Sequence, residues 1–349
     1  MACAGNLNTL HRQHHPLKSD SQEYNKGTTM VITMKINIAS KLRSKRTITS
    51  FLISALAIYF LATIIDINKT VNVLKSVNLS YFILAMLIYY SSIPIRGYRW
   101  KLLLENVKFK GKLKDVTEIW FLAYFINCLV PAKLGDIYRG YLIRKNYKMP
   151  ISRTLGTILT KRVADIIFLI ILLTLSGYIV FGKYLPSDIS NLMNYNHIAL
   201  FLGIFFLICL SLQKNRIISF IPQRLRIYFL EFELGFSKSI THRNILQIII
   251  LTIICWSTDI LRLYFVAVSL SLAIPIPLII FIALCASLLS SLPITPAGLG
   301  AVELAMVSIL VLLGYDINIS ASIAILDRII NFWSFIVLGI PIYFLSDKK

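Results

Sequence analysis

The sequence predicts an all-α integral membrane protein with six full membrane spans and two re-entrant hairpins, arranged as an inverted repeat. Three observations predict this fold. Of the 349 residues, 57% are hydrophobic and only 15% are charged, whereas a soluble domain carries about 25% charged residues. The Lys and Arg residues gather on alternate loops between apolar stretches. A Pro-Ala-x-Leu-Gly motif occurs twice, at 131–135 and at 296–300.

Residues 1–40 are polar and show no sustained periodicity, which predicts a disordered N-terminal tail. His11, His14 and His15 lie in this tail without a set of carboxylates or cysteines, so they do not predict a metal site. The five cysteines show no CxxC spacing and mostly lie in apolar stretches, as small buried side chains do. We therefore expect no metal and no cofactor.

The membrane domain is expected to cover 41–345, with halves at about 41–181 and 197–345. Its apolar stretches are close to the roughly 20 residues that a helix needs to cross a bilayer. The predicted spans are 48–65, 79–95, 159–181, 197–212, 245–272 and 321–345. Each half then holds two spans, a hairpin and a third span. The first half begins inside and the second begins outside, which makes the repeats inverted.

The distribution of charge predicts the orientation of these spans. The formal net charge is +20, and a basic block at 41–46 comes directly before the first span. Lys and Arg concentrate on the cytoplasmic side of membrane proteins, and most of the 36 in this chain fall on one predicted side. We therefore expect a multi-pass protein of the plasma membrane with both termini in the cytoplasm.

Two apolar regions are too short to cross fully. The first, 116–130, has basic flanks on both sides and would be only about 22 Å long, against a bilayer core of about 30 Å. If it crossed, the basic loop at 216–243 would lie outside, against the charge rule. The second region has two arms, 278–291 and 299–314, of about 21 to 24 Å each. We expect two re-entrant hairpins, although two short full spans would preserve the same topology at the second.

The segment 290–303 joins the arms of the second hairpin and carries the stronger copy of the motif. Proline removes a backbone donor, and backbone groups freed at membrane depth must be buried by protein or line a wet cavity. The weaker copy lies at 130–136 in the first half, and paired interruptions of this kind point to a transport site. If the hairpins are repeats, their tips should approach each other, and Glu303 should then face Arg139.

Four signatures occur in order along the chain: Arg96-x-x-Arg99-Trp100, Pro131-Ala-Lys-Leu-Gly135-Asp136-x-x-Arg139, Lys161-Arg162-x-x-Asp165, and Leu292-Pro-x-x-Pro296-x-Gly298-x-Gly300-x-x-Glu303 followed by Asp327-Arg328. Together they resemble the transmembrane region of lysylphosphatidylglycerol synthases, a flippase-like membrane family also found in archaeal and bacterial surface-glycan pathways. The resemblance covers about 43–345. The family often has Glu at the positions of Asp136 and Lys161, and the second of these departures reverses the sign of the charge.

The resemblance implies a flippase whose hairpins and charged residues line a polar cavity for an anionic lipid headgroup. The expected ligand is an anionic phospholipid or a polyprenyl-phosphate-linked lipid, with no nucleic acid partner and with a homodimer left open. We expect no soluble aminoacyl-transferase domain of the kind that the full synthases carry, and therefore no lysyl transfer. The candidate headgroup-binding residues are Arg96, Arg99, Lys133, Asp136, Arg139, Arg162, Asp165, Pro296, Gly298, Gly300, Glu303, Asp327 and Arg328.

Two sets of alternatives stay open. In a purely structural interpretation, charges near one another in sequence neutralise each other between helices, and Arg96 and Arg99 extend to the membrane interface. The pairs would be Asp165–Arg162, Asp259–Arg262 and Asp327–Arg328. Among functions, the alternatives to a flippase are a membrane-embedded aminoacyl or glycosyl transferase and a small-molecule carrier. No DxD motif or Gly-rich phosphate loop supports a transferase, and only the resemblance favours a flippase over a carrier.

Overall fold

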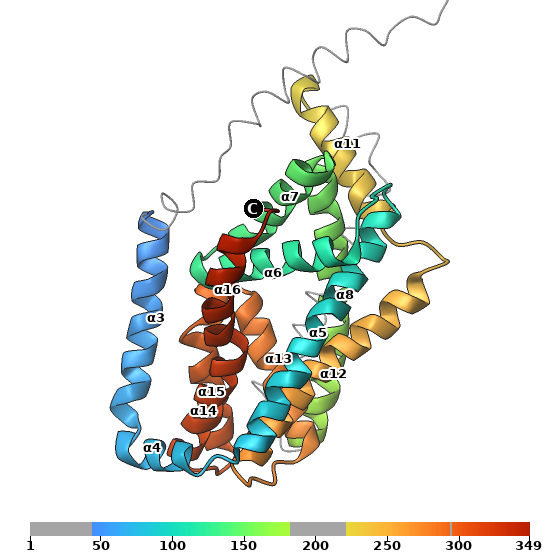
Figure 1. Cartoon of the computed structure of the whole chain (residues 1–349). Coiled ribbons are helices and arrows are strands. Elements are labelled where there is room, and N and C mark those ends of the chain that lie inside the picture. Colours follow the sequence, from blue (N-terminus) through green and yellow to red (C-terminus); the bar gives the residue numbers. More distant parts are fainter. Residues whose placement is uncertain (1–43, 182–220, 294) are drawn as a thin grey trace, which may run out of the picture. The chain divides into compact units, whose positions relative to one another are not determined.

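The computed structural model describes residues 44–181, 221–293 and 295–349, and within these ranges the regular structure is entirely helical (Figure 1). The predicted tail at 1–40 and the predicted fourth span at 197–212 lie outside the described residues. The ordered helices therefore test five of the six predicted spans and both predicted hairpin regions.

Five helices in the described residues are long and apolar enough to cross a membrane. They match the predicted first, second, third, fifth and sixth spans. The first four are α3 (Lys45–Ile64), α5 (Leu79–Glu105), α8 (Ile151–Phe181) and α12 (Ile245–Ser269). The last is continuous through α15 (Ile317–Arg328), a π-helical turn (Ile329–Trp333) and α16 (Ser334–Leu345).

Two of these helices extend further than predicted, which changes the position of several charged residues. α5 continues past residue 95 to Glu105, so Arg96 and Arg99 lie inside the helix and not at its end. α8 begins directly after Pro150, so Lys161 and Arg162 lie in its interior and not in its first turns. The physical reason is that Arg, Lys and Leu are good helix formers, and the charges here are paired with carboxylates on a neighbouring helix or, for Lys161, one turn along α8.

The two predicted hairpin regions each contain short helices. The first holds α6 (Leu113–Leu129, 17 residues) and α7 (Leu134–Tyr147, 14 residues). The second holds α13 (Ile276–Ser291, 16 residues), the 3₁₀ turn η2 (Pro296–Gly298) and α14 (Ala301–Leu312, 12 residues). At about 1.5 Å per residue, each is shorter than a bilayer core of about 30 Å. Figure 1 shows α6 running across the direction of α3, α5 and α8.

Two more helices connect these elements. The link between the first two predicted spans contains α4 (Ile67–Lys75), which packs on α15. The amide of Asp66, at its start, donates to Asn318 Oδ1 at 2.8 Å. α11 (Gln223–Ser237) packs along α8, where Arg153 and Glu231 form a two-pronged ion pair. Where α6 begins and α7 ends, the hydroxyl of Tyr147 donates to Asp115 and thereby holds the pKa of that carboxyl below its usual value.

Candidate functional site

The two Pro-Ala-x-Leu-Gly turns share an unusual backbone conformation. In the first, Ala132 and Lys133 have φ of 63° and 55°, and in the second, Ala297 and Gly298 have φ of 45° and 77°. Positive φ is uncommon for residues other than glycine because the Cβ crowds the backbone. The two copies of the motif therefore share positive φ at their second and third residues, although they lie in different halves of the chain. They differ after that, since Leu134 and Gly135 already begin α7, whereas Gly300 has a φ of 86° before α14 begins.

Arg328 and Glu303 satisfy the backbone groups that the second turn exposes. Arg328 Nη1 and Nη2 donate to the carbonyls of Ala297 and Gly298 at 3.2 and 2.9 Å. Glu303 Oε2 accepts from the amide of Gly300 at 2.8 Å, which caps the first turn of α14. Glu303 Oε1 lies 2.9 Å from Arg328 Nε, an ion-pair distance, although that N–H does not point at the oxygen. The break in the membrane helix is thus closed by protein groups, as burial in hydrocarbon requires.

The glycines of the second turn are required by close contacts. Gly300 has a φ of 86°, and a Cβ there would lie 2.8 Å from Ala57 Cβ and 3.0 Å from the carbonyl oxygen of Ser54, both on α3. A Cβ on Gly298 would lie 2.8 Å from the Cα of Ser290. The second turn is therefore packed directly against α3 and α13.

The first turn contacts the second hairpin region through one lysine. Lys133 Nζ donates to the carbonyl oxygen of Ser290, near the end of α13, at 2.7 Å. α6 also packs on η2. The first turn itself is held by the Asn127 side chain, whose Oδ1 accepts from the amide of Gly135 at 2.8 Å. The two turns are neighbours, as predicted.

Six buried or partly buried charges form a neutral network across α5, α12, α14 and α15. Each cation has one carboxylate within 3 Å. The pairs are Arg96–Asp259 at 2.8 Å, Arg262–Asp327 at 3.0 Å and Arg328–Glu303 at 2.9 Å. The structure contradicts all three sequence-local pairs, because each side chain pairs with a different residue. These pairs were Asp165–Arg162, Asp259–Arg262 and Asp327–Arg328. The expectation that Glu303 faces Arg139 was also wrong, since Glu303 pairs with Arg328.

A second group of charges, which we name the basic cluster, gathers between α5, α7 and α8. It contains five cations and two carboxylates: Arg99, Lys133, Arg139, Lys161 and Arg162, with Asp136 and Asp165. Arg99 binds Asp165 with both Nη atoms, at 2.7 and 3.2 Å, and Lys161 Nζ lies 3.1 Å from the same carboxylate. Arg162 binds Asp136. Five positive charges against two negative ones leave a formal excess of three.

Arg139 is the least satisfied member of the basic cluster. Its side chain is only 5% exposed, and its nearest carboxylate oxygen, Asp136 Oδ1, is 3.8 Å away, while Arg162 binds the other oxygen of the same carboxylate. Its Nε has no hydrogen-bond partner. Its guanidinium instead lies over the ring of Trp100, 4.8 Å from the centroid. A ring face attracts a cation but supplies no negative charge, so Arg139 is buried without a full counter-charge.

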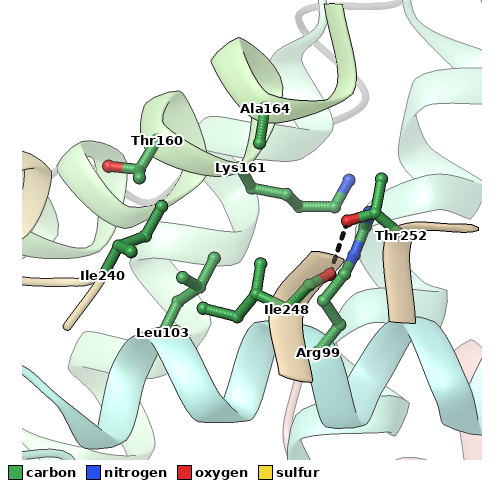
Figure 2. Close-up of a pocket in the computed structure, with 8 residues that line it drawn as sticks. All are labelled: Arg99, Leu103, Thr160, Lys161, Ala164, Ile240, Ile248 and Thr252. Carbon is green, nitrogen blue, oxygen red and sulfur yellow. Dashed lines mark hydrogen bonds between the residues drawn. The ribbon is translucent and has the colours of Figure 1, made fainter. Parts of the chain in front are cut away.

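A small cavity lies beside the basic cluster (Figure 2). Arg99 and Lys161 line it, and Arg99 Nη1 also donates to Thr252 Oγ1 at 2.9 Å. Its volume of about 10 Å³ is enough for about one water molecule. This volume is too small for a lipid headgroup in this conformation.

The structure divides the predicted site residues into three places. Six lie in the basic cluster: Arg99, Lys133, Asp136, Arg139, Arg162 and Asp165. Four lie in the neutral network: Arg96, Glu303, Asp327 and Arg328. Pro296, Gly298 and Gly300 form the second turn. Arg96 and Arg99 do not extend to an interface, because both are ion-paired inside the bundle.

The sequence interpretation missed two contributors to the basic cluster. Lys161 was left off the candidate set because its sign departs from the family, yet its spacing of four from Asp165 signals an ion pair on one helical face. Trp100 was not considered a site residue, and it lies buried beneath Arg139. No sequence signal identifies that contact, because it joins α5 to α7 through tertiary packing.

Comparison with known proteins places the chain among membrane proteins of one family. A family model described as the lysylphosphatidylglycerol synthase TM region matches residues 47–339. A UPF0104 membrane protein of Methanocaldococcus jannaschii is 34% identical over 225 residues, which cover 64% of this chain and 95% of the relative. A UPF0104 membrane protein of Pyrococcus horikoshii is 21% identical over 309 residues, covering 81% and 92%.

A more distant similarity reaches the glycosyltransferase AglD of Haloferax volcanii. It is 23% identical over 145 residues, which cover 42% of this chain but only 23% of that protein. The family match extends over both turns, the neutral network and the basic cluster. The chain therefore belongs to the family of the lysylphosphatidylglycerol synthase transmembrane region and is a multi-pass membrane protein.

Proposed function

We propose that this protein translocates an anionic lipid or lipid-linked precursor across the membrane, with the basic cluster holding the headgroup. The observation that carries the proposal is the excess of three positive charges between α5, α7 and α8. An uncompensated buried charge costs several kcal/mol. Charges inside membrane bundles face the interior and mark substrate pathways. An anionic headgroup would supply the missing counter-charge.

The proposed architecture is a pair of inverted repeats with six spans and two re-entrant hairpins. The positive φ of Ala132 and Ala297 supports this, because a conformation that is rare for alanine occurs at corresponding positions of the two turns. Inverted repeats with interrupted helices are the architecture of alternating-access carriers. The proposal places both termini in the cytoplasm and the protein in the plasma membrane, and it requires neither a cofactor nor a second copy of the chain.

Movement between the two turns would open the site. The contact of Lys133 with the carbonyl of Ser290 ties the first turn to the second hairpin region. The second turn is fixed by Arg328 and by its packing on α3. Separation at the Lys133 contact would therefore move α7, with Arg139, relative to the rest of the cluster. This motion would open space between α7 and the residues of the basic cluster on α5 and α8, next to the small cavity that α5, α8 and α12 line.

The second candidate is a membrane-embedded glycosyl transferase that acts on a lipid. The similarity to the glycosyltransferase AglD favours it, although the match covers only 23% of that protein. The two candidates differ in their product. A transferase converts the lipid chemically, whereas a translocator moves an unchanged lipid between leaflets.

Reconstitution in liposomes of zwitterionic phosphatidylcholine tests the proposal. The probes are a fluorescent phosphatidylglycerol and a fluorescent polyprenyl phosphate, with leaflet exchange followed by chemical quenching from outside. We expect wild-type protein to move at least one probe unchanged, and Arg139→Gln to slow it at least about tenfold, because a charge-assisted contact contributes about 1.5–3 kcal/mol. The control is Lys101→Gln, which removes the partly exposed ion pair that Lys101 forms with Glu105 one turn further along α5. This variant should leave the rate of leaflet exchange unchanged.

Movement at the wild-type rate by correctly folded Arg139→Gln would overturn the assignment of the headgroup site. Chemical conversion of a probe supplied with a sugar donor, without leaflet exchange, would favour the transferase.

A further inference from the structure

We infer that the basic cluster selects a lipid headgroup with two or more negative charges, a phosphate monoester or a diphosphate, over a phosphodiester lipid with one charge. This rests on the proposed function and narrows its substrate class. The inference starts from the count of charges, since five cations in the cluster face only two carboxylates in the described part of the chain.

The neutral network supplies the internal comparison. There, in the same bundle, each of three cations has its own carboxylate within 3 Å. The protein thus neutralises its buried cations one for one in this network. The same helix α5 carries Arg96 in the neutral network and Arg99 in the basic cluster. The shortage of carboxylates is therefore specific to one location and not a general property of this bundle.

The size of the excess sets the charge of the ligand. A phosphodiester headgroup neutralises one of the three unmatched charges and leaves two without a counter-charge inside the bundle, which remains costly. A phosphate monoester carries about 1.5 to 2 negative charges at neutral pH, and a diphosphate adds a further ionised group. Only these headgroups bring the cluster close to neutrality.

The identity and placement of the cations suit a phosphate group. Arg99 comes from α5, Arg139 from α7, and Lys161 and Arg162 from α8. Guanidinium groups bind phosphate oxygens in a two-pronged fashion, whereas lysine acts as a point charge. The Nε atoms of Arg99 and Arg139 have no hydrogen-bond partner, and both side chains are at least nine-tenths buried. Donors are thus available at two sides of the cluster without breaking its existing pairs.

Lys133 adds a cation that can respond to the ligand. It is the only member of the cluster, among the described residues, that binds a carbonyl and no carboxylate within 4 Å. A phosphate in the cluster would compete with the carbonyl of Ser290 for this ammonium. Binding of a multiply charged headgroup would therefore release the contact between the two turns.

Binding measurements in nanodiscs of phosphatidylcholine, without divalent cations, test the inference independently of transport. The soluble probes are inorganic pyrophosphate and dimethyl phosphate, a diester with one charge. The lipid probes are farnesyl diphosphate and phosphatidylglycerol, used to displace labelled pyrophosphate. We expect pyrophosphate to bind at least about tenfold more tightly than dimethyl phosphate, since it gains additional charge-assisted contacts. We expect farnesyl diphosphate to displace it at lower concentration than unlabelled pyrophosphate does.

Matched variants locate the binding. Lys161→Gln and Arg139→Gln should each weaken pyrophosphate binding at least about tenfold, and Arg139→Lys should retain most of it because the charge remains. Lys101→Gln, the same substitution as at Lys161 but outside the cluster, should bind like the wild type. If Lys161→Gln and Lys101→Gln weaken pyrophosphate binding equally, the assignment of the binding site to the basic cluster is overturned.

The wild-type protein alone is sufficient to refute the inference. Equal affinity for pyrophosphate and dimethyl phosphate would overturn the preference for multiple charges, while translocation of a singly charged lipid would still stand. Displacement by farnesyl diphosphate no better than by pyrophosphate would indicate a free phosphate ligand and overturn the assignment to a lipid. Conversely, selective binding of the diphosphates without leaflet exchange would refute the proposed translocation and leave the charge preference intact.

Discussion

Glu303 has a different role from the one its place after the second turn suggests. It caps Gly300 and pairs with Arg328, whose other nitrogens hold the carbonyls of the turn. These contacts make Glu303 a residue that builds the broken helix, whereas Arg139 is the buried cation left without a full partner. An acid that follows a Pro-Gly break can thus serve to close the backbone and not to contact the substrate.

Removal of one member of the Glu303–Arg328 pair should destabilise the protein more than its individual contacts suggest. Glu303→Gln leaves a buried guanidinium unpaired, which costs about 3–5 kcal/mol. The double variant with Arg328→Gln should lose much less than the sum of the two single losses. Unfolding of purified protein in mixed detergent micelles measures this coupling. The Lys101–Glu105 pair, with 19% and 40% exposed side chains, is the control, and its coupling should stay below about 1 kcal/mol.

If the losses at Glu303 and Arg328 are additive, the pair does not hold the turn, and Glu303 would again be available for a substrate role.

At the scale of residues, the sequence could not predict which oppositely charged residue each charged side chain pairs with. Asp259 and Arg262 share a helical face, so a local pair was reasonable. The long Arg side chains instead reach across helices, Arg96 to Asp259 and Arg262 to Asp327. Which partner each finds depends on how the helices pack, and spacing along one helix carries no information about that.

At the scale of elements, the packing of α3 on the second turn is specified by one glycine. α3 contacts α14, and in the view of Figure 1 the helices α14 to α16 lie between α3 and α5. The first span of the first half therefore packs on the hairpin region of the second half. This exchange between halves was not predicted, because the sequence shows which stretches are helices but not which of them are neighbours.

A comparison of two glycines tests this contact. Gly300 and Gly314 have nearly the same φ, 86° and 87°, but a Cβ on Gly314 has no atom within 4 Å. Gly→Ala therefore places an alanine at positive φ at both positions. Gly300→Ala additionally forces a Cβ against Ala57 and should cost about 1–3 kcal/mol more, the usual cost of overpacking.

Thermal or detergent-induced unfolding of the two purified variants measures the difference. Equal destabilisation would mean that α3 does not rest on the second turn in the membrane.

At the scale of the whole molecule, the sequence predicted the helical class and most of the span positions, because hydrophobicity and length are local properties. It placed the ends of α5 and α8 wrongly. The predicted ends relied on Arg96 and Lys161 as interface markers, but their charges are paired inside the bundle. The charge rule identifies cytoplasmic loops reliably only for charges that remain in water. The division into a neutral network and a basic cluster needed the tertiary structure.

The two ends of α5 define the two predicted faces of the membrane domain. Its start follows α4, and the backbone amide of Asn78 there donates to the carbonyl of Ser269, at the end of α12, at 2.7 Å. Its other end contacts the segment after α11, where Asn106 Nδ2 donates to the carbonyl of Ser239 at 2.6 Å. The 27 residues of α5 separate these faces by about 40 Å, enough to cross a bilayer.

Labelling of single cysteines on the two faces tests the orientation. Lys75, at the end of α4, and Lys238, after α11, are both exposed, so Lys75→Cys and Lys238→Cys are matched substitutions in a cysteine-free background. The positive-inside rule places the basic α11 region in the cytoplasm. We expect a membrane-impermeant maleimide to label Lys75→Cys on intact cells and Lys238→Cys only after permeabilisation. The reverse pattern would invert the topology, and labelling of both from outside would show that α5 does not cross.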